Sequence, residues 1–307
     1  MRGCLAASCG CLWLDPCPSP EDIGRAYDAY YTHGARAPWV EQAALRVWTL
    51  MGQITLAGQH RRAVGPVPSL VGRTLAPLIE AVPTVALHLA LLLRYLPPPA
   101  PGMAVLDVGC GDGFALQILE QTGWRVEGQE VDPKAVAAAT ARGLRVRQGR
   151  LEDCHFAENS FDAVTSSHVL EHVHEPEAML RTMHRLLKPG GTLVAVTPNA
   201  RSANLPRFGG SWLNLDPPRH LMLFSPEALA ELAGRAGFQR CAVTTTLRAV
   251  ATSEVASRHI RARGQHSWAD RGSWSDRLAG WRRQWTQILN GDAGRGRGDD
   301  LVLTATK

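Results

Sequence analysis

Residues 103–113 read M-A-V-L-D-V-G-C-G-D-G, and this stretch decides the fold. It begins as an apolar run of strand length that carries Asp107 at its end. Gly109, Gly111 and Gly113 follow at every second position, where glycine allows a positive φ and a close approach of a ligand to the backbone. The helix expected next would point free N–H groups at such a ligand. The stretch therefore predicts a strand, a tight ligand-binding loop and a helix.

The spacing of these glycines indicates which ligand the loop takes. Dinucleotide-binding folds use G-x-G-x-x-G and seat a pyrophosphate at the helix N-terminus, whereas this loop reads G-x-G-x-G. A carboxylate two residues ahead of the first glycine repels a diphosphate and attracts an ammonium group. The stretch resembles motif I of the class I S-adenosylmethionine-dependent methyltransferases, whose cofactor ends in an amino acid. A tight turn in another doubly wound protein is the alternative.

A second carboxylate ends the next expected strand, residues 124–131. Glu130 lies 23 residues after Asp107, where nucleotide-binding folds place the acidic residue that binds a ribose. We expect Glu130 to accept hydrogen bonds from both ribose hydroxyls. A solvent-exposed glutamate at a strand end is the alternative.

The resemblance extends this cofactor site to neighbouring positions. A third expected strand, 144–148, leads into a loop that borders the adenine in the family, and Arg150 stands there where many members have an acid. The segment 167–173, S-H-V-L-E-H-V, closely resembles the one after strand four in the ubiquinone-pathway O-methyltransferases. The resemblance implies cofactor contacts from Asp107, Gly109, Cys110, Gly111, Gly113, Glu130, Val131, Leu151, Glu152 and His168.

Three histidines are candidates for chemistry on the methyl acceptor. His168 follows the fourth expected strand, 160–165, at the sheet edge where open α/β folds bind ligands. His172 shares its face if the segment is helical. His220, in the family-like segment 216–221, is the first candidate for a general base, and the other two are its competitors. A role for His220 only in shaping the pocket is the alternative. No third metal ligand is evident beside these histidines, so we expect no metal site.

The alternation of strand and helix patterns predicts an α/β fold. We expect a doubly wound, mostly parallel, seven-stranded sheet that is Rossmann-like, with the last strand antiparallel and a helical segment at the N-terminus. Strand five is expected at 192–197 after a tight P-G-G turn at 189–191, and the edge strands at 241–247 and 300–306.

A proline-rich segment marks the expected domain boundary. Residues 97–102 read P-P-P-A-P-G and cannot continue a helix. Residues 1–96 then form a lead-in that contains cysteines and helices, and residues 97–307 form a methyltransferase domain with a basic, tryptophan-rich insertion at about 248–299. The lead-in helices either pack on the catalytic core or form a lid over the substrate.

Four cysteines, Cys4, Cys9, Cys11 and Cys17, crowd into the first 17 residues. Their spacing does not give the two close pairs that zinc sites use. The run from Cys9 onward resembles the end of a zinc-ribbon lead-in carried by some methyltransferases of this group, with its first cysteine pair missing. We expect a remnant of that element, and a helix that begins at Ser19-Pro20-Glu21.

Charge and hydropathy indicate an ordinary globular protein with one basic region. The net charge of +5 is local, because residues 248–298 contain ten arginines, no lysine and four acids. The apolar segment 82–96 is too short and too polar to span a bilayer, and the N-terminus is unlike an export signal. We expect a cytoplasmic protein that contacts a membrane peripherally if the basic region binds lipid.

The basic region contains a helix with one tryptophan-rich face, formed by Trp274, Leu278, Trp281, Trp285 and Ile288. Three interpretations stay open. The tryptophans dock on the sheet, the helix at 274–289 lies on an anionic membrane surface, or its arginines pair with nucleic acid phosphates.

These patterns together predict an S-adenosylmethionine-dependent methyltransferase that acts on an oxygen of a small molecule, a saccharide or a lipid-linked precursor. An RNA methyltransferase is one alternative, although the confinement of charge to one segment argues against a nucleic acid partner. A non-catalytic protein that keeps the fold is the other. The oligomeric state and the acceptor do not follow from the sequence.

Overall fold

The structure is a computed structural model of the chain, and it describes residues 1–4, 9–23, 38–267, 270 and 272–307. The chain divides into two compact units. The glycine-loop unit consists of Ala35–Ser167, Thr182–Val194 and Thr306–Lys307. The histidine unit consists of Met1–Gly34, His168–Arg181 and Ala195–Ala305. The domain boundaries expected from the sequence stay a prediction.

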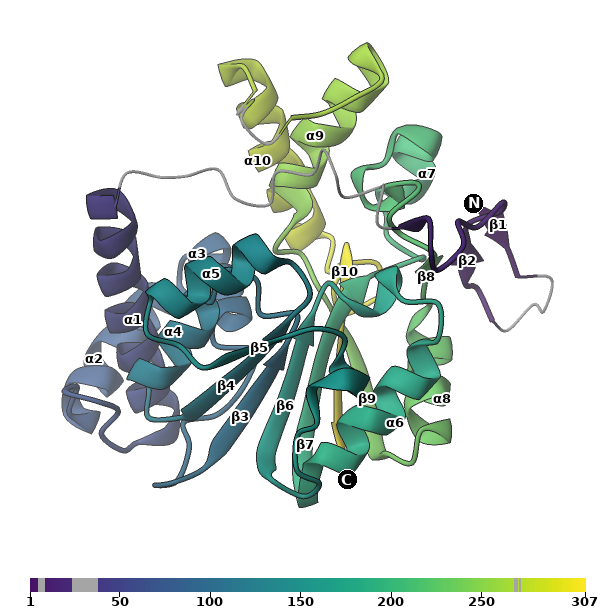
Figure 1. Cartoon of the computed structure of the whole chain (residues 1–307). Coiled ribbons are helices and arrows are strands. Elements are labelled where there is room, and N and C mark those ends of the chain that lie inside the picture. Colours follow the sequence, from purple (N-terminus) through teal and green to yellow (C-terminus); the bar gives the residue numbers. More distant parts are fainter. Residues whose placement is uncertain (5–8, 24–37, 268–269, 271) are drawn as a thin grey trace. The chain divides into compact units, whose positions relative to one another are not determined.

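A seven-stranded sheet has the strand order β5-β4-β3-β6-β7-β10-β9 (Figure 1). Its strands are β3 (Ala104–Val108), β4 (Arg125–Glu130), β5 (Val146–Gln148), β6 (Phe161–Ser167), β7 (Leu187–Pro198), β9 (Gln239–Thr246) and β10 (Asp300–Thr306). β3 pairs in parallel with β4 and β6, and β4 pairs in parallel with β5. Val108 lies opposite Gln129 and Ser166, so three strands end at one edge. The last strands are antiparallel, which confirms the predicted Rossmann-like fold.

The start of β7 corrects one expectation. The sequence predicts a tight turn at residues 189–191, but β7 begins directly after α6 (Pro176–Leu186) and contains these residues. Gly190 N donates to Lys307 O at 3.1 Å, and Lys307 N donates to Gly191 O at 3.0 Å. The segment is therefore held as a strand by hydrogen bonds to the C-terminal end of the chain.

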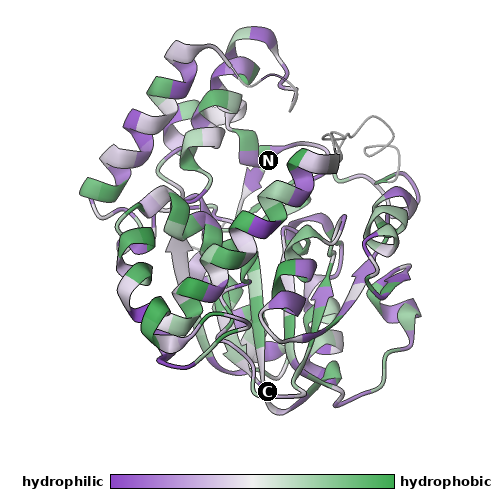
Figure 2. Cartoon of the chain, turned by 90° about the vertical axis from the view of Figure 1, so that its left-hand side faces the viewer, coloured by the Kyte–Doolittle hydropathy of each residue, from purple (hydrophilic) through white to green (hydrophobic). Residues whose placement is uncertain are grey.

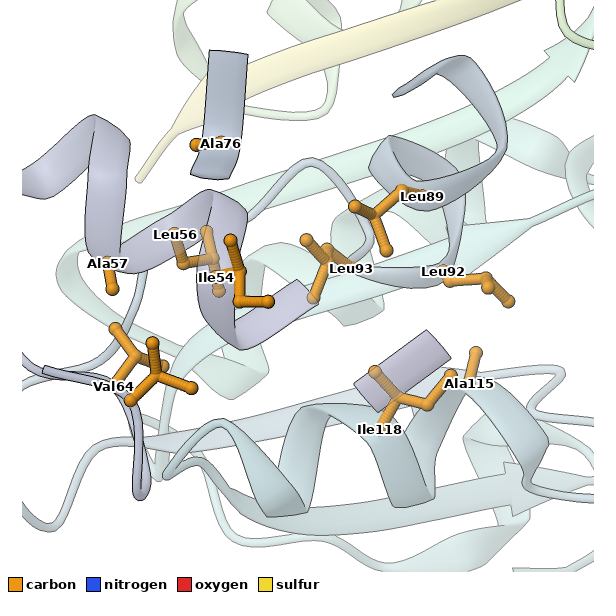
Figure 3. Packing of buried hydrophobic residues seen from close by; sticks show 11 residues of the cluster. Ile54, Leu56, Ala57, Val64, Ala76, Leu89, Leu92, Leu93, Ala115 and Ile118 are labelled. Atoms are coloured by element: carbon orange, nitrogen blue, oxygen red, sulfur yellow. The ribbon is translucent and has the colours of Figure 1, made fainter. Parts of the chain in front are cut away.

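The N-terminal helices pack on the α/β core. The glycine-loop unit contains α1 (Pro38–His60), α2 (Ser69–Glu80), α3 (Pro83–Leu92), α4 (Phe114–Gln121) and α5 (Pro133–Ala141), with a 3-10 turn at Leu151–Cys154. Ile54 of α1, Leu89 of α3 and Ile118 of α4 share one buried hydrophobic cluster (Figure 3). Of the two alternatives for these helices, packing on the core is the one that the structure confirms for α1 and α3.

Hydrophobic and hydrophilic residues are mixed along the helices (Figure 2). Among the described residues, no single helix has both the length and the apolar composition needed to cross a membrane. Of the helices that the structure describes, only α2 and α3 taken together have that length and composition, and the chain bends by 118° at the break between the two helices. Leu89 and Leu92 of α3 are part of the buried cluster.

The histidine unit contains a second, small sheet of order β1-β2-β8. Its elements are β1 (Arg2–Gly3), β2 (Leu12–Trp13), β8 (Met222–Leu223), α7 (Leu205–Phe208), α8 (Pro226–Arg235), α9 (Val250–Arg263) and α10 (Trp274–Leu289), with 3-10 turns at Leu170–His172, Gly209–Ser211 and Leu213–Leu215. Leu12 packs against a buried cluster that includes Trp212 and Leu223. The N-terminal hairpin is therefore anchored by apolar contacts.

The first cysteines lie on this hairpin. Cys4 N donates to Cys11 O at 3.0 Å. Burial raises the pKa of the Cys11 thiol to about 11, so this side chain is protonated at neutral pH, whereas a zinc ligand is a thiolate. The zinc-ribbon remnant stays a prediction. Of the helix expected from Ser19, only the start is described, where Asp22 N donates to Ser19 Oγ at 3.2 Å.

Helices α9 and α10 pack against each other in the histidine unit (Figure 1). The interpretation that the tryptophans of α10 dock on the sheet is wrong, because Trp274, Trp281 and Trp285 are exposed. The buried positions of α10 are Gly280, Gln284 and Gln287 instead.

Candidate functional site

The glycine loop has the backbone geometry that its spacing predicts. Gly109, Gly111 and Gly113 have φ values of 70°, 59° and 79°, a region that side chains with a Cβ rarely adopt. The loop is attached to β4, because Gly109 N and Cys110 N both donate to Gln129 O, at 2.8 and 3.1 Å. The strand, the loop and the following helix α4 are therefore confirmed.

Two of these glycines leave very different space around them. A Cβ on Gly113 would lie 2.3 Å from Leu144 Cδ1 and 3.1 Å from Ala139 Cβ, so this glycine allows α4 to start close to its neighbours. A Cβ on Gly111 would meet nothing within 4 Å. Gly111 is therefore the point of the loop at which a ligand can approach the backbone.

Glu130 supports the loop from the end of β4. Its Oε2 accepts a hydrogen bond from Gly111 N at 2.9 Å. Its Oε1 accepts hydrogen bonds from Val131 N at 2.7 Å and from Asp132 N at 3.0 Å. A carboxylate has about four acceptor positions, so Oε2 keeps one for a hydroxyl of a ligand. The expected ribose contact stays a prediction, and bracing of the loop is a second role that the sequence did not indicate.

Asp107 is buried, and its expected contact with the cofactor stays a prediction. Its side chain is 0% exposed and forms a buried ion pair with Arg94, whose Nη2 lies 2.7 Å from Oδ2. Thr165 Oγ1 donates to Oδ1 at 2.7 Å. The carboxylate lies on a strand that is buried along its length, where the guanidinium of Arg94 compensates its charge. We therefore assign Asp107 a positioning role beneath the loop.

The other expected cofactor residues of this unit differ in exposure. Cys110 and Leu151 are buried, whereas Val131 is exposed and offers an apolar surface beside Glu130. Glu152 forms an exposed ion pair of 3.7 Å with Arg150. Burial, followed by the charge of Asp107, raises the pKa of Cys110, so its thiol is not a nucleophile. The contacts of these residues with a cofactor stay predictions.

Sequence reasoning missed two residues that hold this loop. Arg94 pairs with Asp107, and a guanidinium at the end of the apolar segment 82–96 was the signal, since a buried charge needs a partner. Gln129 accepts from Gly109 N at 3.3 Å through Oε1 and donates to Gly149 O at 2.5 Å through Nε2. A glutamine inside a strand gave no such signal.

The histidine unit brings His168, Glu171, His172 and His220 together, and we call these four residues the histidine cluster. His168 Nδ1 lies 3.2 Å from Glu171 Oε1, and Thr197 Oγ1 donates to Glu171 Oε2 at 3.0 Å. His168 has a φ of 58°, which costs about 1–3 kcal/mol in a residue with a side chain. Backbone strain of this kind is common at functional sites.

His172 and His220 are held in the same tautomer. Each Nδ1 lies near a backbone carbonyl, 3.0 Å from Arg219 O for His172 and 2.7 Å from Asn214 O for His220. Because a carbonyl only accepts, both Nδ1 atoms carry a proton, so in the neutral form of either ring the lone pair lies on Nε2. The two rings lie at 70° to each other, with their centroids 4.7 Å apart.

The pKa values of Glu171 and His220 are both lowered in the histidine cluster. Burial alone would raise the pKa of Glu171, but the hydrogen bond from His168 and the charge of His172 outweigh it and lower the pKa to about 2. Burial lowers the pKa of His220. The cluster therefore combines a permanent carboxylate with an imidazole that is neutral at pH 7, an arrangement typical of acid–base sites.

No third metal ligand beside His168 and His172 was evident in the sequence, but the structure brings a candidate set together, and the expectation of no metal site stays a prediction. Ligand atoms of Glu171, His172 and His220 all lie within 4.8 Å of one another, so these residues could hold a metal ion. His220 comes from a distant segment, which is why no spacing showed it. Both oxygens of Glu171 already accept hydrogen bonds from His168 and Thr197. A carboxylate has about four acceptor positions, so these three residues could either hold a metal ion or transfer protons.

Several buried polar atoms in the histidine unit have no hydrogen-bond partner within the described part of the chain. They are His168 Nε2, Asn214 Nδ2, Arg248 Nε and both carboxylate oxygens of Asp300. Arg248 Nη2 is 4.0 Å from Asp300 Oδ2. Burial opposes protonation of His168, but the hydrogen bond with Glu171 and the charge of Asp300 outweigh it and raise the pKa. Buried groups of this kind are normally satisfied, so they point to a polar ligand.

Comparison with known proteins finds a matching family and several similar proteins. Residues 83–243, more than half of the chain, match the family described as "Methyltransferase domain". A protein of Mycolicibacterium smegmatis that is named as an S-adenosylmethionine-dependent methyltransferase is 29% identical over 209 residues, which cover 66% of this chain and 75% of that protein.

Two further similarities are more limited. The ubiquinone biosynthesis O-methyltransferase of Xanthomonas campestris pv. campestris is 39% identical over 110 residues, which cover 34% of this chain and 46% of that protein. This chain thus matches about half the length of that relative. A Haloferax volcanii methyltransferase solved in complex with the Trm112 activator has a TM-score of 0.50 at 19% identity, and the match covers 76% of this chain and 94% of that chain. It supports the fold alone.

Proposed function

Since the chain belongs to the class I S-adenosylmethionine-dependent methyltransferases, we propose that it transfers a methyl group to an oxygen of a hydroxylated acceptor. The observation that carries the proposal is the state of His220, a neutral imidazole whose Nδ1–H is bound by Asn214 O. Such a group can take the proton of a hydroxyl. The limited similarity to an O-methyltransferase supports the same acceptor atom.

The glycine-loop unit has the features needed to hold the cofactor. Gly111 leaves open space against the backbone, Glu130 has an acceptor position for a ribose hydroxyl, and Val131 gives an exposed apolar contact. When bound, S-adenosylmethionine supplies an electrophilic methyl group on a sulfonium sulfur. The unit's own contribution is to position that group and exclude water, and such proximity effects supply up to about 7–11 kcal/mol of the barrier.

The histidine unit supplies the acid–base groups for the acceptor. His220 Nε2 takes the hydroxyl proton as the acceptor oxygen gains its methyl group, and the imidazole becomes positively charged. Glu171 stabilises that charge, because its carboxylate stays ionised and its charge acts on His220. General base catalysis of this kind contributes about 10²–10⁴-fold in rate.

The unsatisfied polar atoms indicate the class of acceptor. His168 Nε2 and Arg248 Nε lie on the same unit as the carboxylate of Asp300, and all lack hydrogen-bond partners among the described residues. A ligand with several hydroxyl groups can both donate to Asp300 and accept from Arg248. We therefore favour a polyhydroxylated acceptor, a class that includes saccharides and the polar heads of lipid-linked precursors.

The proposal is tested by measuring S-adenosylhomocysteine formation with matched acceptors. Each acceptor carrying a free hydroxyl is compared with its methyl ether and with the analogue in which an amine replaces the hydroxyl. We expect product only from the free hydroxyl compounds, and the protein without acceptor is the control. Faster turnover of the amines, or equal turnover of the blocked ethers, would contradict methylation on oxygen.

A further inference from the structure

Helix α10 is oriented with its polar side inward and its apolar side outward. Five large apolar residues lie four, three, four and four positions apart, so they form one stripe along the helix. Their exposed fractions are 82% for Trp274, 60% for Leu278, 64% for Trp281, 43% for Trp285 and 82% for Leu289. We call these five residues the α10 stripe. A contiguous apolar surface of this kind marks an interaction site.

Specific contacts fix this orientation. Gln284 Nε2 donates to Leu247 O at 3.0 Å, and Arg283 Nε donates to Asn204 Oδ1 at 3.1 Å. A Cβ on Gly280 would lie 2.5 Å from Ala251 O, so the inner side of α10 touches the backbone of α9. Turning the helix to bury the stripe would break these contacts. The exposure of the stripe is therefore part of the fold.

The charges beside the stripe are positive. Arg277 and Arg282, each adjacent to a stripe residue in the sequence, are exposed. Within the described residues neither has an acidic partner within 4.0 Å, and the guanidinium of Arg277 lies 4.8 Å from the ring centre of Trp274. Asp276 is the acid of this helix, and it caps the N-terminus by accepting from Ser273 N at 3.1 Å. The exposed side of α10 therefore combines apolar surface with unpaired positive charge.

We propose that the α10 stripe binds the surface of an anionic phospholipid bilayer. Tryptophan prefers the interface between headgroups and acyl chains, and leucine inserts slightly deeper. Arg277 and Arg282 then lie at the level of the phosphates, which attract basic residues near the membrane surface. The helix would lie parallel to the membrane, with its inner side still attached to α9.

The positive charge beside the α10 stripe favours an anionic bilayer over a second copy of the chain as the binding partner. In a symmetric dimer the same surface would face itself. Arg277 and Arg282 of both copies would then approach one another, with no acid on the stripe to pair with them. An anionic bilayer offers both an apolar layer and the opposite charge. This inference does not depend on the acceptor proposed above.

The test is co-sedimentation of the full chain with vesicles of phosphatidylcholine, with and without phosphatidylglycerol. We expect at least tenfold stronger binding to the anionic vesicles. Leu278→Ser/Trp281→Ser should reduce that binding at least tenfold, and Arg277→Gln/Arg282→Gln should remove the preference for anionic lipid. Trp39→Ser is the matched control, because Trp39 is 74% exposed on α1 and should not affect binding.

Three outcomes would overturn the proposal. The first is equal binding by the wild type and Leu278→Ser/Trp281→Ser. The second is a dimer in light scattering that this double variant dissociates, which would assign the stripe to a second copy. The third is retention of single-stranded RNA, but not of vesicles, that depends on Arg277 and Arg282. Circular dichroism of each variant checks that the fold is kept.

Discussion

The glycine loop and the histidine cluster are assembled in different ways. The loop obtains its geometry from a few consecutive residues and the adjacent strand, through the positive φ of Gly109, Gly111 and Gly113. The cluster joins segments that are 47 residues apart, as the hydrogen bond between His172 and Arg219 shows. The spacing of glycines in a sequence shows where the backbone needs a positive φ. A sequence does not show which side chains from distant segments meet. Each variant proposed below changes one of the two units and leaves the other unchanged.

The largest effect is expected from Arg94, beneath the glycine loop. Arg94→Leu leaves the carboxylate of Asp107 buried without its partner, and breaking a buried ion pair from one side costs about 3–5 kcal/mol. The free energy of unfolding in urea measures this loss. The double variant Arg94→Leu/Asp107→Asn should recover part of it, because the buried charge is then gone. A loss below about 1 kcal/mol in the single variant would show that the ion pair is unimportant.

The next effect concerns the histidine cluster. His220→Gln removes the basic nitrogen, so turnover should fall about 10²-fold or more, while the affinity for S-adenosylmethionine stays unchanged. His174→Gln is the control, since His174 bonds to Pro18 O away from the cluster. In the wild type, burial lowers the pKa of His220, so turnover should be full at pH 7 and fall only below about 6.5. Unchanged turnover in His220→Gln would remove it from the mechanism.

A smaller effect is expected from two glycine variants, whose comparison separates backbone strain from loss of ligand contact. Gly111→Ala and Gly143→Ala both place a side chain at positive φ with no atom within 4 Å, at 59° and 84°. Each should cost about 1–2 kcal/mol of stability. Only Gly111→Ala should weaken cofactor binding, which calorimetry measures. Equal weakening by both variants would show that strain, and not contact, controls the site.

A further effect is a pH dependence in the histidine unit. Burial raises the pKa of Asp299 to about 6, above its value in the unfolded chain. The stability that protonated Asp299 contributes is therefore fully present below pH 3.8 and is lost as the pH rises through about 6. Asp299→Asn should flatten the unfolding free energy between pH 4 and 7. A variant that keeps the wild-type slope would assign the slope to another group.

Much of the fold was predictable from the sequence, because it follows from local patterns. The apolar run before Gly109 and the later alternation of strands and helices gave the sheet, and Glu130 was placed by its distance from Asp107. The turn expected at residues 189–191 failed because Lys307, at the other end of the chain, holds that segment as a strand. Pairing over such a distance leaves no local signal.

The site was predictable only in part. His168, His172 and His220 were named singly, but Glu171 was missed because a glutamate between two histidines looks like any exposed acid. The orientation of α10 was left open among three interpretations, since a tryptophan stripe usually indicates a buried face. Here hydrogen bonds of Gln284 and Arg283 decide which side is buried. Their partners lie in segments remote in sequence.

Titration calorimetry with S-adenosylmethionine and S-adenosylhomocysteine tests the central claim most directly, that the glycine loop holds the cofactor while the histidine cluster acts on the acceptor. The wild type should bind both with micromolar affinity. Glu130→Ala removes the brace of Gly111 and the ribose acceptor, so it should bind at least tenfold more weakly, whereas His220→Gln should bind like the wild type. No binding by the wild type, or equal binding by Glu130→Ala, would contradict the account.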